Sequence, residues 1–230
     1  MISTPPGLIL WQDESLLVIN KPWGLLTLPD GYDKTLPHLK SMLSPVYGRL
    51  WIVHRLDKDT SGVLLLARSA DAHRSLNTQF EQRQVLKTYH VLVVGNPAWE
   101  EKVCSLPLRA NGDRKHRTVI DFQRGKPAET HLEVIERFNT HTLLAAHPKT
   151  GRPHQIRAHL AALDFPIAGD MLYDSRAEHE QALLTEWISR PALHARSIAF
   201  KHPLTGEAVS FEAPYPEDLS AALRHLRQLS

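Results

Sequence analysis

Short apolar runs separated by polar turns recur along this 230-residue chain and limit the folds it can adopt. Some alternate in polarity, as Lys87–Val94 does with Tyr89, Val91 and Val93 on one side, which predicts a strand. Neighbouring runs are joined by short turns, which is typical of hairpins. Strands are expected at Leu16–Asn20, Leu50–Val53, Val63–Ala67, Lys87–Val94, Thr130–Arg137, His141–His147, Ser197–Phe200 and Ala208–Phe211.

Three segments carry a helical pattern instead. Ser69 can cap a helix over Ala70–Arg83, Gly151-Arg152-Pro153 can open a second, and a third runs from about Pro216 with Leu219, Leu223 and Leu226 toward the core. Strands outnumber helices, and no Pro/Gly/Ser-rich linker divides the chain. We expect an α+β fold, a single domain over residues 1–230 on a mostly antiparallel mixed sheet flanked by helices.

Composition excludes several classes of protein. Apolar residues make up 42% and charged residues 23%, which is ordinary for a globular chain. No uninterrupted apolar stretch is long enough for a transmembrane helix, and the N-terminus lacks the basic start of a signal peptide. The single cysteine, Cys104, excludes an internal disulfide and a Cys-rich zinc site. We therefore expect a cytoplasmic protein without a membrane partner.

Charge is nearly balanced, at a formal +2, but it is unevenly distributed. The segment Arg109–Lys126 holds six Lys or Arg residues against two Asp, and His147–His159 holds three cations and no acid. One face directed at phosphates would produce such a pattern, and so would ordinary solvated loops.

The turn His54–Gly62, with sequence HRLDKDTSG, is the most unusual stretch. It places Asp57 and Asp59 in a tight loop between two expected strands, and loops on rigid strands often carry catalytic groups. An Asp-rich turn that only satisfies its own backbone is the alternative.

A second stretch, Thr150–Leu160 with sequence TGRPHQIRAHL, is expected to be helical. His154 and Arg157 then share a face, and with the helix N-terminus they could bind a phosphate or a carboxylate. A solvated amphipathic helix is the alternative. Tyr89, on its strand, is either a core residue or part of a site.

Other chemistries find little support in the residues. There is no H-E-x-x-H motif, and no His pair at helical spacing beside a carboxylate, so no metal site is predicted. Nucleophile-elbow, Walker and G-x-G-x-x-G motifs are missing too. Asp57 and Asp59 could serve a glycosidase, although the basic segments do not favour a neutral glycan.

Taken together, these stretches resemble the RluA-type RNA pseudouridine synthases over about residues 8–215. The strings H-R-L-D-x-x-T-S-G and T-G-R-x-H-Q-I-R-x-H-L are long and specific. The matching residues are Asn20-Lys21-Pro22 with Gly24; His54-Arg55-Leu56-Asp57 with Thr60-Ser61-Gly62; Lys87 with Tyr89; Lys126-Pro127-Ala128 with Thr130; Thr150-Gly151-Arg152 with His154-Gln155-Ile156-Arg157 and His159-Leu160; Gly169-Asp170 with Tyr173; and Leu193-His194-Ala195.

The resemblance implies a catalytic domain with a central cleft, the pseudouridine synthase fold, and an isomerase that needs no cofactor or metal. Asp57 would be the essential carboxylate, whether it attacks the base, attacks the sugar or removes the 2′ proton. Tyr89 would stack on the target base, Arg157 would pair with Asp57, and Arg55 would fill the space of the flipped uridine. The implied partner is RNA, a ribosomal or transfer RNA stem-loop, with no obligate protein partner.

Further RNA contacts are expected from the matched motifs and from the basic segment. These residues are Lys21, His54, Arg152, His154 and Gln155, together with Arg114, Lys115 and Arg117. The match at Lys21 comes too early to leave room for the small N-terminal RNA-binding domain of some relatives. Asp174 stands where the family often has glycine, which changes that loop only. A non-catalytic RNA-binding module and a carboxylate-dependent nucleoside or glycoside hydrolase remain the competing functions.

Overall fold

The computed structural model describes residues 7–31, 33–174 and 186–229. These fall into two compact units. The first is drawn from Met1–Lys87 and Ala195–Pro214, and the second from Thr88–His194 and Tyr215–Ser230. Each unit therefore combines two separate stretches of chain. The expectation of one domain over residues 1–230 stays a prediction.

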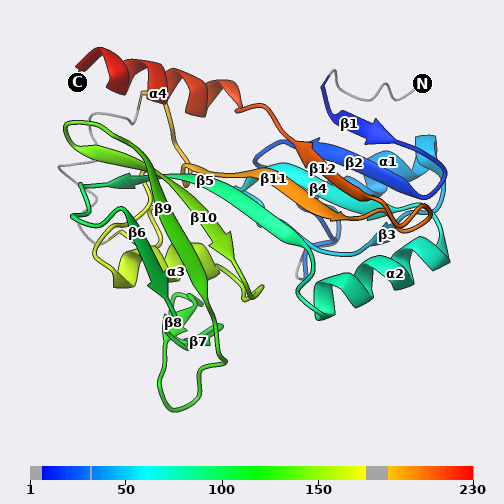
Figure 1. Cartoon of the computed structure of the whole chain (residues 1–230), viewed down its shortest axis with the longest axis horizontal. Coiled ribbons are helices and arrows are strands. Elements are labelled where there is room, and N and C mark those ends of the chain that lie inside the picture. Colours follow the sequence, from blue (N-terminus) through cyan, green and yellow to red (C-terminus); the bar gives the residue numbers. More distant parts are fainter. Residues whose placement is uncertain (1–6, 32, 175–185, 230) are drawn as a thin grey trace. The chain divides into compact units, whose positions relative to one another are not determined.

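The first unit is built around two strands whose residues are almost all buried, labelled β2 and β4 in Figure 1. Its elements are β1 (Ile9–Gln12), β2 (Leu16–Lys21), α1 (Leu39–Tyr47), β3 (Trp51–Ile52), β4 (Ser61–Ala67), α2 (Ala70–Glu81), most of β11 (Leu193–Lys201) and β12 (Ala208–Glu212). The strand order is β1-β2-β4-β11, with β3 also beside β4 and β12 beside β11. All seven residues of β4 are buried, which explains why its sequence is a continuous apolar run and not an alternating one.

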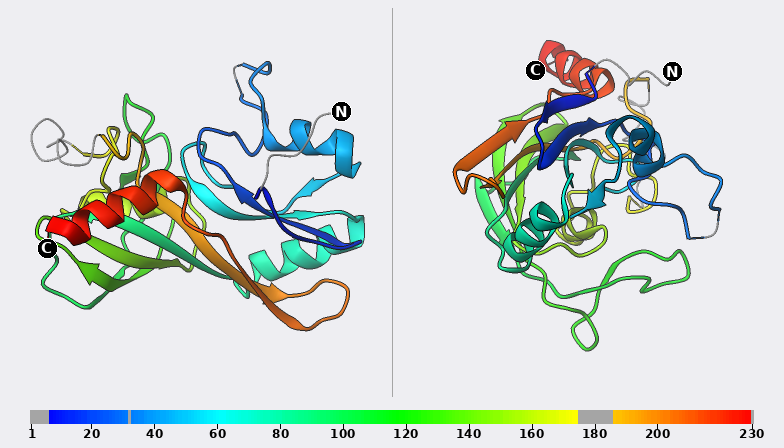
Figure 2. Two further views of the ribbon diagram at one scale, coloured as in Figure 1. Left: turned by 90° about the horizontal axis from the view of Figure 1, so that it is seen from above. Right: turned by 90° about the vertical axis from the view of Figure 1, so that its right-hand side faces the viewer.

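The second unit contains most of β5 (Leu86–Val94), then β6 (Glu101–Cys104), β7 (Leu108–Arg109), β8 (Val119–Ile120), β9 (Thr130–Arg137), β10 (His141–Pro148), α3 (Gln155–Ala162) and α4 (Glu217–Leu229). Its strands run in the order β5-β10-β9-β6, and β7 and β8 form a separate two-stranded sheet. The helix α4, red in Figure 2, buries Leu219, Leu223 and Leu226 in the same core as strand β5.

Pairing in both units is antiparallel in β1–β2, β2–β4, β5–β10, β9–β10, β6–β9 and β11–β12. The predicted α+β class and mostly antiparallel sheet are therefore confirmed. Ser69 caps α2 as expected, by accepting a hydrogen bond from the Ala72 amide. That helix ends at Glu81, before the predicted Arg83, whose backbone is left-handed.

The start of α3 differs from the prediction that Pro153 opens it. The helix begins at Gln155, and His154 precedes it with a left-handed backbone (φ 50°, ψ 23°). Pro153 lies one residue further out, where its carbonyl accepts a hydrogen bond from the Thr118 hydroxyl. Pro153 therefore belongs to the turn before the helix and not to its first turn.

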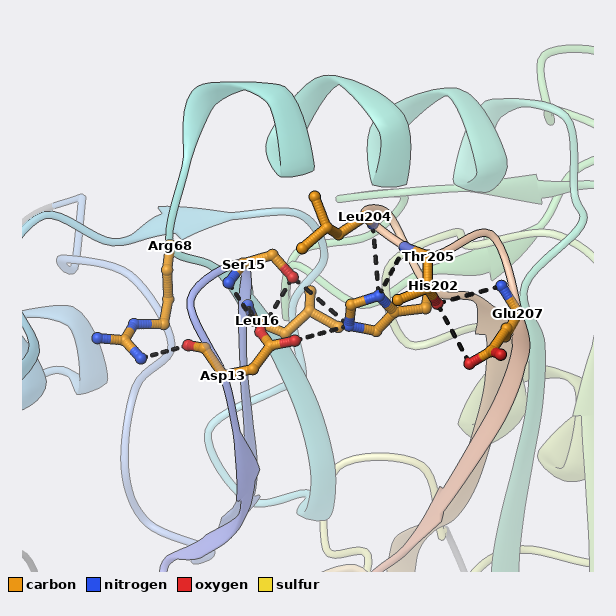
Figure 3. A network of polar contacts seen from close by, with 8 residues as sticks. All are labelled: Asp13, Ser15, Leu16, Arg68, His202, Leu204, Thr205 and Glu207. Carbon is orange, nitrogen blue, oxygen red and sulfur yellow. Dashed lines mark hydrogen bonds and ion pairs between the residues drawn. The ribbon is translucent and has the colours of Figure 1, made fainter.

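A polar network joins two turns of the first unit (Figure 3). His202, after β11, donates from Nε2 to Asp13 Oδ2 at 2.9 Å, because its Nδ1 accepts the Thr205 amide at 3.2 Å. Burial raises the pKa of Asp13, but hydrogen bonds from the Leu16 and Ser15 amides outweigh it and lower that pKa overall. The hydrogen bonds of the Asp13 carboxylate therefore link the turn between β1 and β2 to the turn between β11 and β12.

Gly62 gives a test of the β4–β11 contact. Its φ is +114°, and a Cβ built there would lie 2.2 Å from the Ala195 carbonyl oxygen. Gly62→Ala should lower the free energy of unfolding by about 2 kcal/mol or more, from backbone strain and this overlap. Gly206→Ala is the control, because its φ is +74° and no atom lies within 4 Å. Urea unfolding measures both, and equal losses would contradict the role of the close contact.

Candidate active site

The loop between β3 and β4 presents Arg55 and Asp57, and its middle residue anchors it. Leu56 is buried, whereas Arg55 is exposed and Asp57 is partly exposed. The carbonyl of Leu56 accepts a hydrogen bond from the buried Thr27 hydroxyl at 2.9 Å, and its amide donates to the same oxygen at 3.4 Å. The two charged neighbours therefore extend from a fixed backbone.

Lys21 holds the other half of this loop. Its side chain is fully buried, and Nζ donates to the carbonyls of Pro22 at 2.9 Å, Leu25 at 2.8 Å and Lys58 at 3.1 Å. The Gly24 amide also donates to Lys58 O, at 2.8 Å. A buried ammonium with three carbonyl partners positions the loop that carries Asp57, and the expected RNA contact of Lys21 stays a prediction.

His54, at the start of the loop, is also held inside the unit. Its Nε2 accepts the Leu65 amide at 3.0 Å, and its ring stacks on Phe80 with centroids 4.9 Å apart. Burial, followed by the charge of Lys87, lowers the pKa of His54 to about 3. Burial also lowers the pKa of Lys87. A neutral, packed His54 fixes the loop entrance, a role that the predicted RNA contact did not include.

In the second unit, Arg157 forms a buried fork with Asp170. Nε and Nη2 of Arg157 donate to the two carboxylate oxygens at 2.6 and 2.7 Å. The exposed fractions are 8% for Arg157 and zero for Asp170. Asp170 also accepts the amides of Leu172 and Tyr173, so its charge is well compensated. Asp170 lies in one of the motifs that resemble the family, but no local pattern in the sequence indicates its pairing with Arg157.

Tyr173 completes this cluster. The guanidinium carbon of Arg157 lies 4.8 Å from the centre of its ring, within range of a cation–π interaction. Its hydroxyl accepts the Thr118 amide at 2.8 Å and lies 3.1 Å from Nδ1 of His154. Burial raises the pKa of Tyr173, so the hydroxyl keeps its proton at neutral pH. The cluster thus orients Arg157 from two sides.

Gln155 fixes the loop before α3. Its Oε1 accepts the Thr150 hydroxyl at 2.7 Å and the Arg152 amide at 3.0 Å, while Nε2 donates to Glu129 O and Thr130 Oγ1. The side chain is buried, and both ends of its amide are engaged. These bonds give Gln155 a structural role, and its RNA contact stays a prediction.

Tyr89 lies on β5 opposite Ala146 of β10 and is partly buried against the core of the second unit. Tyr89 and Arg157 belong to the second unit, and Asp57 belongs to the first. The cleft and the Asp57–Arg157 pair remain predictions.

The basic segment mixes exposed and paired cations. Arg114 and Lys115 are exposed. Arg117 donates from Nε to Asp113 Oδ2 at 2.6 Å, and hydrogen bonds from the Arg117 amide and side chain lower the pKa of that carboxyl. Arg152 is partly exposed and donates from Nε to Pro127 O at 3.1 Å. Arg114 and Lys115 are therefore better placed for a phosphate than Arg117.

Two features bear on cofactors and membranes. Within residues 7–31, 33–174 and 186–229, no three His, Cys, Asp or Glu side chains are grouped so as to hold a metal ion. In the same ranges, no helix is both long enough and apolar enough to cross a membrane.

Comparison with known proteins gives the family. Residues 15–162 match the RNA pseudouridylate synthase family. The chain belongs to this family. Its members are isomerases that convert uridine to pseudouridine in RNA, so this chain is an RNA pseudouridylate synthase. The match spans the loop of Asp57, strand β5 and helix α3.

Individual relatives agree with this assignment. The dual-specificity RNA pseudouridine synthase RluA of Pasteurella multocida is 40% identical over 207 residues, covering 90% of this chain and 92% of that protein. The ribosomal large subunit pseudouridine synthase D of Zymomonas mobilis is 35% identical, covering 95% and 72%. The human RNA pseudouridylate synthase domain containing 4 superimposes with a TM-score of 0.77 at 26% identity, covering 95% of this chain and 92% of that one.

Removing the Lys21 charge tests how the Asp57 loop is held. Lys21→Met in the RNA pseudouridylate synthase removes a donor from three carbonyls, of which Lys58 O keeps the Gly24 amide, so it should lower the free energy of unfolding by about 3 kcal/mol. Amide hydrogen exchange at Lys58–Thr60 should also accelerate. Lys40→Met, at an exposed position on α1, is the control and should change neither. Unchanged exchange in Lys21→Met would show that the loop is held by other contacts.

The low pKa of His54 predicts a pH dependence of stability. Between about pH 3 and pH 6.5 the unfolded chain binds a proton at His54 that the folded chain does not, so acidification destabilises the fold. Between pH 6.5 and 4.5 this should cost about 1–2 kcal/mol. His54→Gln, whose amide oxygen can still accept the Leu65 amide, should remove that part of the loss. Urea unfolding at each pH measures it, and parallel pH profiles would contradict the assignment.

Proposed function

We propose that this RNA pseudouridylate synthase isomerises specific uridines in structured RNA with Asp57 as its catalytic carboxylate. The observation that carries the proposal is the loop of Asp57. The Thr27 hydroxyl, the Lys21 ammonium and the Gly24 amide donate to its backbone carbonyls and hold it on both sides, while Asp57 itself is only partly buried. A carboxylate on a fixed backbone can meet a reacting atom without a cost of reorganisation.

The reaction breaks the N-glycosidic bond of uridine, rotates the base and joins its carbon 5 to the sugar, and the proton on carbon 5 then leaves. A uridine inside a stem must first leave the stack, at a cost of a few kcal/mol. We propose that Arg55 fills the space that the flipped nucleotide leaves. Arg55 is exposed and lies two residues before Asp57 in the chain. Tyr89 is assigned to stacking on the base and to removing the proton from carbon 5.

Arg157 is proposed to keep Asp57 ionised. Its fork with Asp170 uses Nε and Nη2, and we assign to the same guanidinium a charge interaction with Asp57. A guanidinium stays charged under all physiological conditions and binds carboxylates well, which suits a group that must stay anionic. Support for this pair comes from that chemistry and from the presence of both motifs.

Ribosomal RNA is the first substrate class that we propose, with a transfer RNA stem-loop as the second. The relatives' names refer to the large ribosomal subunit and to dual specificity. The enzyme would act in the cytoplasm, without a cofactor, a metal or an obligate protein partner. Arg114 and Lys115 would contact phosphates, and Arg152 and His154 would lie near the RNA.

Tritium release tests Asp57. With ribosomal RNA labelled with tritium at carbon 5 of uracil, the wild type should release tritium, and Asp57→Asn should reduce the rate by about 10²–10⁴-fold or more. Asp59→Asn is a matched control in the same turn and should keep the wild-type rate.

Other outcomes would overturn the proposal. Equal rates for wild type and Asp57→Asn would remove Asp57 from the chemistry. Release of free uracil would indicate a hydrolase, and RNA binding without tritium release from this substrate would indicate a non-catalytic binding module.

A further inference from the structure

The turn after β8 exposes an aromatic ring to solvent. Phe122 has an exposed fraction of 78%, which is the highest among the large exposed apolar residues of the described ranges. A scattered exposed apolar side chain is ordinary in itself. What sets Phe122 apart is the backbone that carries it.

That backbone is held by a dense set of hydrogen bonds. Asp121 Oδ1 accepts the amides of Gln123 at 2.9 Å and Arg124 at 2.8 Å, the two residues that follow Phe122. Asp121 Oδ2 accepts Arg109 Nε at 2.6 Å. The Gly125 amide donates to Asp121 O at 2.8 Å, and a Cβ at Gly125 would lie 2.2 Å from that oxygen. The position of the Phe122 backbone is therefore fixed before any ligand arrives.

The same turn is tied to the packing around Arg157. Lys126 and Leu108 exchange backbone hydrogen bonds at 2.8 and 2.9 Å. Leu108 is buried in a small cluster with Ala128 and with Ala158 of α3, and Ile120 and Tyr173 pack against it. Ala158 follows Arg157 directly on α3. Figure 1 shows β7 and β8, in green, extending away from strands β5, β9 and β10 of the same unit.

Cations lie close to Phe122 in the sequence. Arg124 and Lys126 are both exposed, two and four residues after the ring. Aromatic side chains interleaved with cations are the usual means by which proteins bind single-stranded RNA, because bases stack on the ring and phosphates meet the charges. Because the backbone that carries the ring is already held, a base that stacks on the ring has to order only the side chain of Phe122, which keeps the entropic cost small.

We propose that Phe122 is a stacking site for an unpaired base of the RNA, separate from the uridine that is isomerised, with Arg124 and Lys126 contacting the neighbouring phosphates. The site serves recognition of the RNA around the target, so it rests on the proposed function. It favours RNA in which a base is unpaired over a fully paired stem.

Binding to an RNA without uridine tests this site apart from the chemistry. The probe is a fluorescein-labelled hairpin of G·C pairs closed by a loop of unpaired adenosines, compared with a blunt duplex of the same stem. Phe122→Ala should raise the Kd for the hairpin by about five- to a hundredfold and leave the Kd for the duplex within about twofold. Fluorescence anisotropy measures both.

Three further variants separate stacking from other effects. Phe122→Trp should keep the hairpin affinity, whereas Phe122→Leu, which is apolar but has no π face, should lose it. Leu204→Ala removes another exposed apolar side chain, 61% exposed on the turn after β11, and should change nothing. The urea midpoints of all variants should match the wild type, because the altered side chains are exposed.

Base stacking can be measured directly with 2-aminopurine placed in the adenosine loop of the hairpin. Stacking quenches its fluorescence, so wild type should quench it and Phe122→Leu should not. The inference is overturned if Phe122→Ala binds the hairpin as wild type does, if hairpin and duplex lose affinity equally, or if Phe122→Leu binds as Phe122→Trp does. Failure of the Asp57 proposal would instead appear as unchanged tritium release in Asp57→Asn.

Discussion

A buried ammonium group, that of Lys21, joins the two loops on which the Asp57 site depends. It donates hydrogen bonds to the carbonyls of Pro22 and Leu25, in the segment that follows β2, and to the carbonyl of Lys58, in the loop between β3 and β4. A lysine loses its hydration when it is fully buried, and three carbonyl partners in good geometry offset that cost. The bond to Lys58, one residue from Asp57, couples the position of the proposed catalytic carboxylate to the end of β2. The placement of Asp57 in the first unit therefore depends on a buried group next to the core.

The second unit uses a buried ion pair for a similar purpose. Taking Arg157 and Asp170 out of water is costly, and an apolar pair of similar volume is often as stable. The pair instead contributes geometry: the fork fixes the plane of the guanidinium, and the ring of Tyr173 limits its movement. In an RNA pseudouridylate synthase, such a fixed cation can meet an anion without rearrangement.

Much of the fold could be predicted because the central strands bury both faces and therefore read as continuous apolar runs. Strand β4 is an example, since Val63–Ala67 is uniformly apolar. Helix α2 could be predicted for a different reason, because Ser69 is a strong N-terminal cap. Helix α1 was missed because Pro45 lies inside it, and β7 and β8 were missed because each has only two residues. The start of α3 was predicted too early, because no residue near His154 in the sequence indicates that its backbone is left-handed.

The site could be predicted only in part. The motif around Asp57 is visible in the sequence, but the burial of Lys21 is not, because a lysine before proline looks like a solvated strand end. Gln155 likewise looks like a helix surface residue until Glu129 and Thr130 are brought to it by β9. Such roles depend on contacts distant in sequence, which local patterns do not encode.

The return of Ala195–Pro214 to the first unit bears on how the chain acquires its structure during synthesis. Strand β4 obtains its neighbour β11, and the core obtains Ile198 and Phe200, only after some two hundred residues have left the ribosome. Until then the nascent N-terminal strands have an open edge and an unfilled core, the condition in which chains associate wrongly. Neither unit is therefore complete until most of the chain has been made, and a truncation after β10 would deprive the first unit of β11 and β12 and the second of α3 and α4.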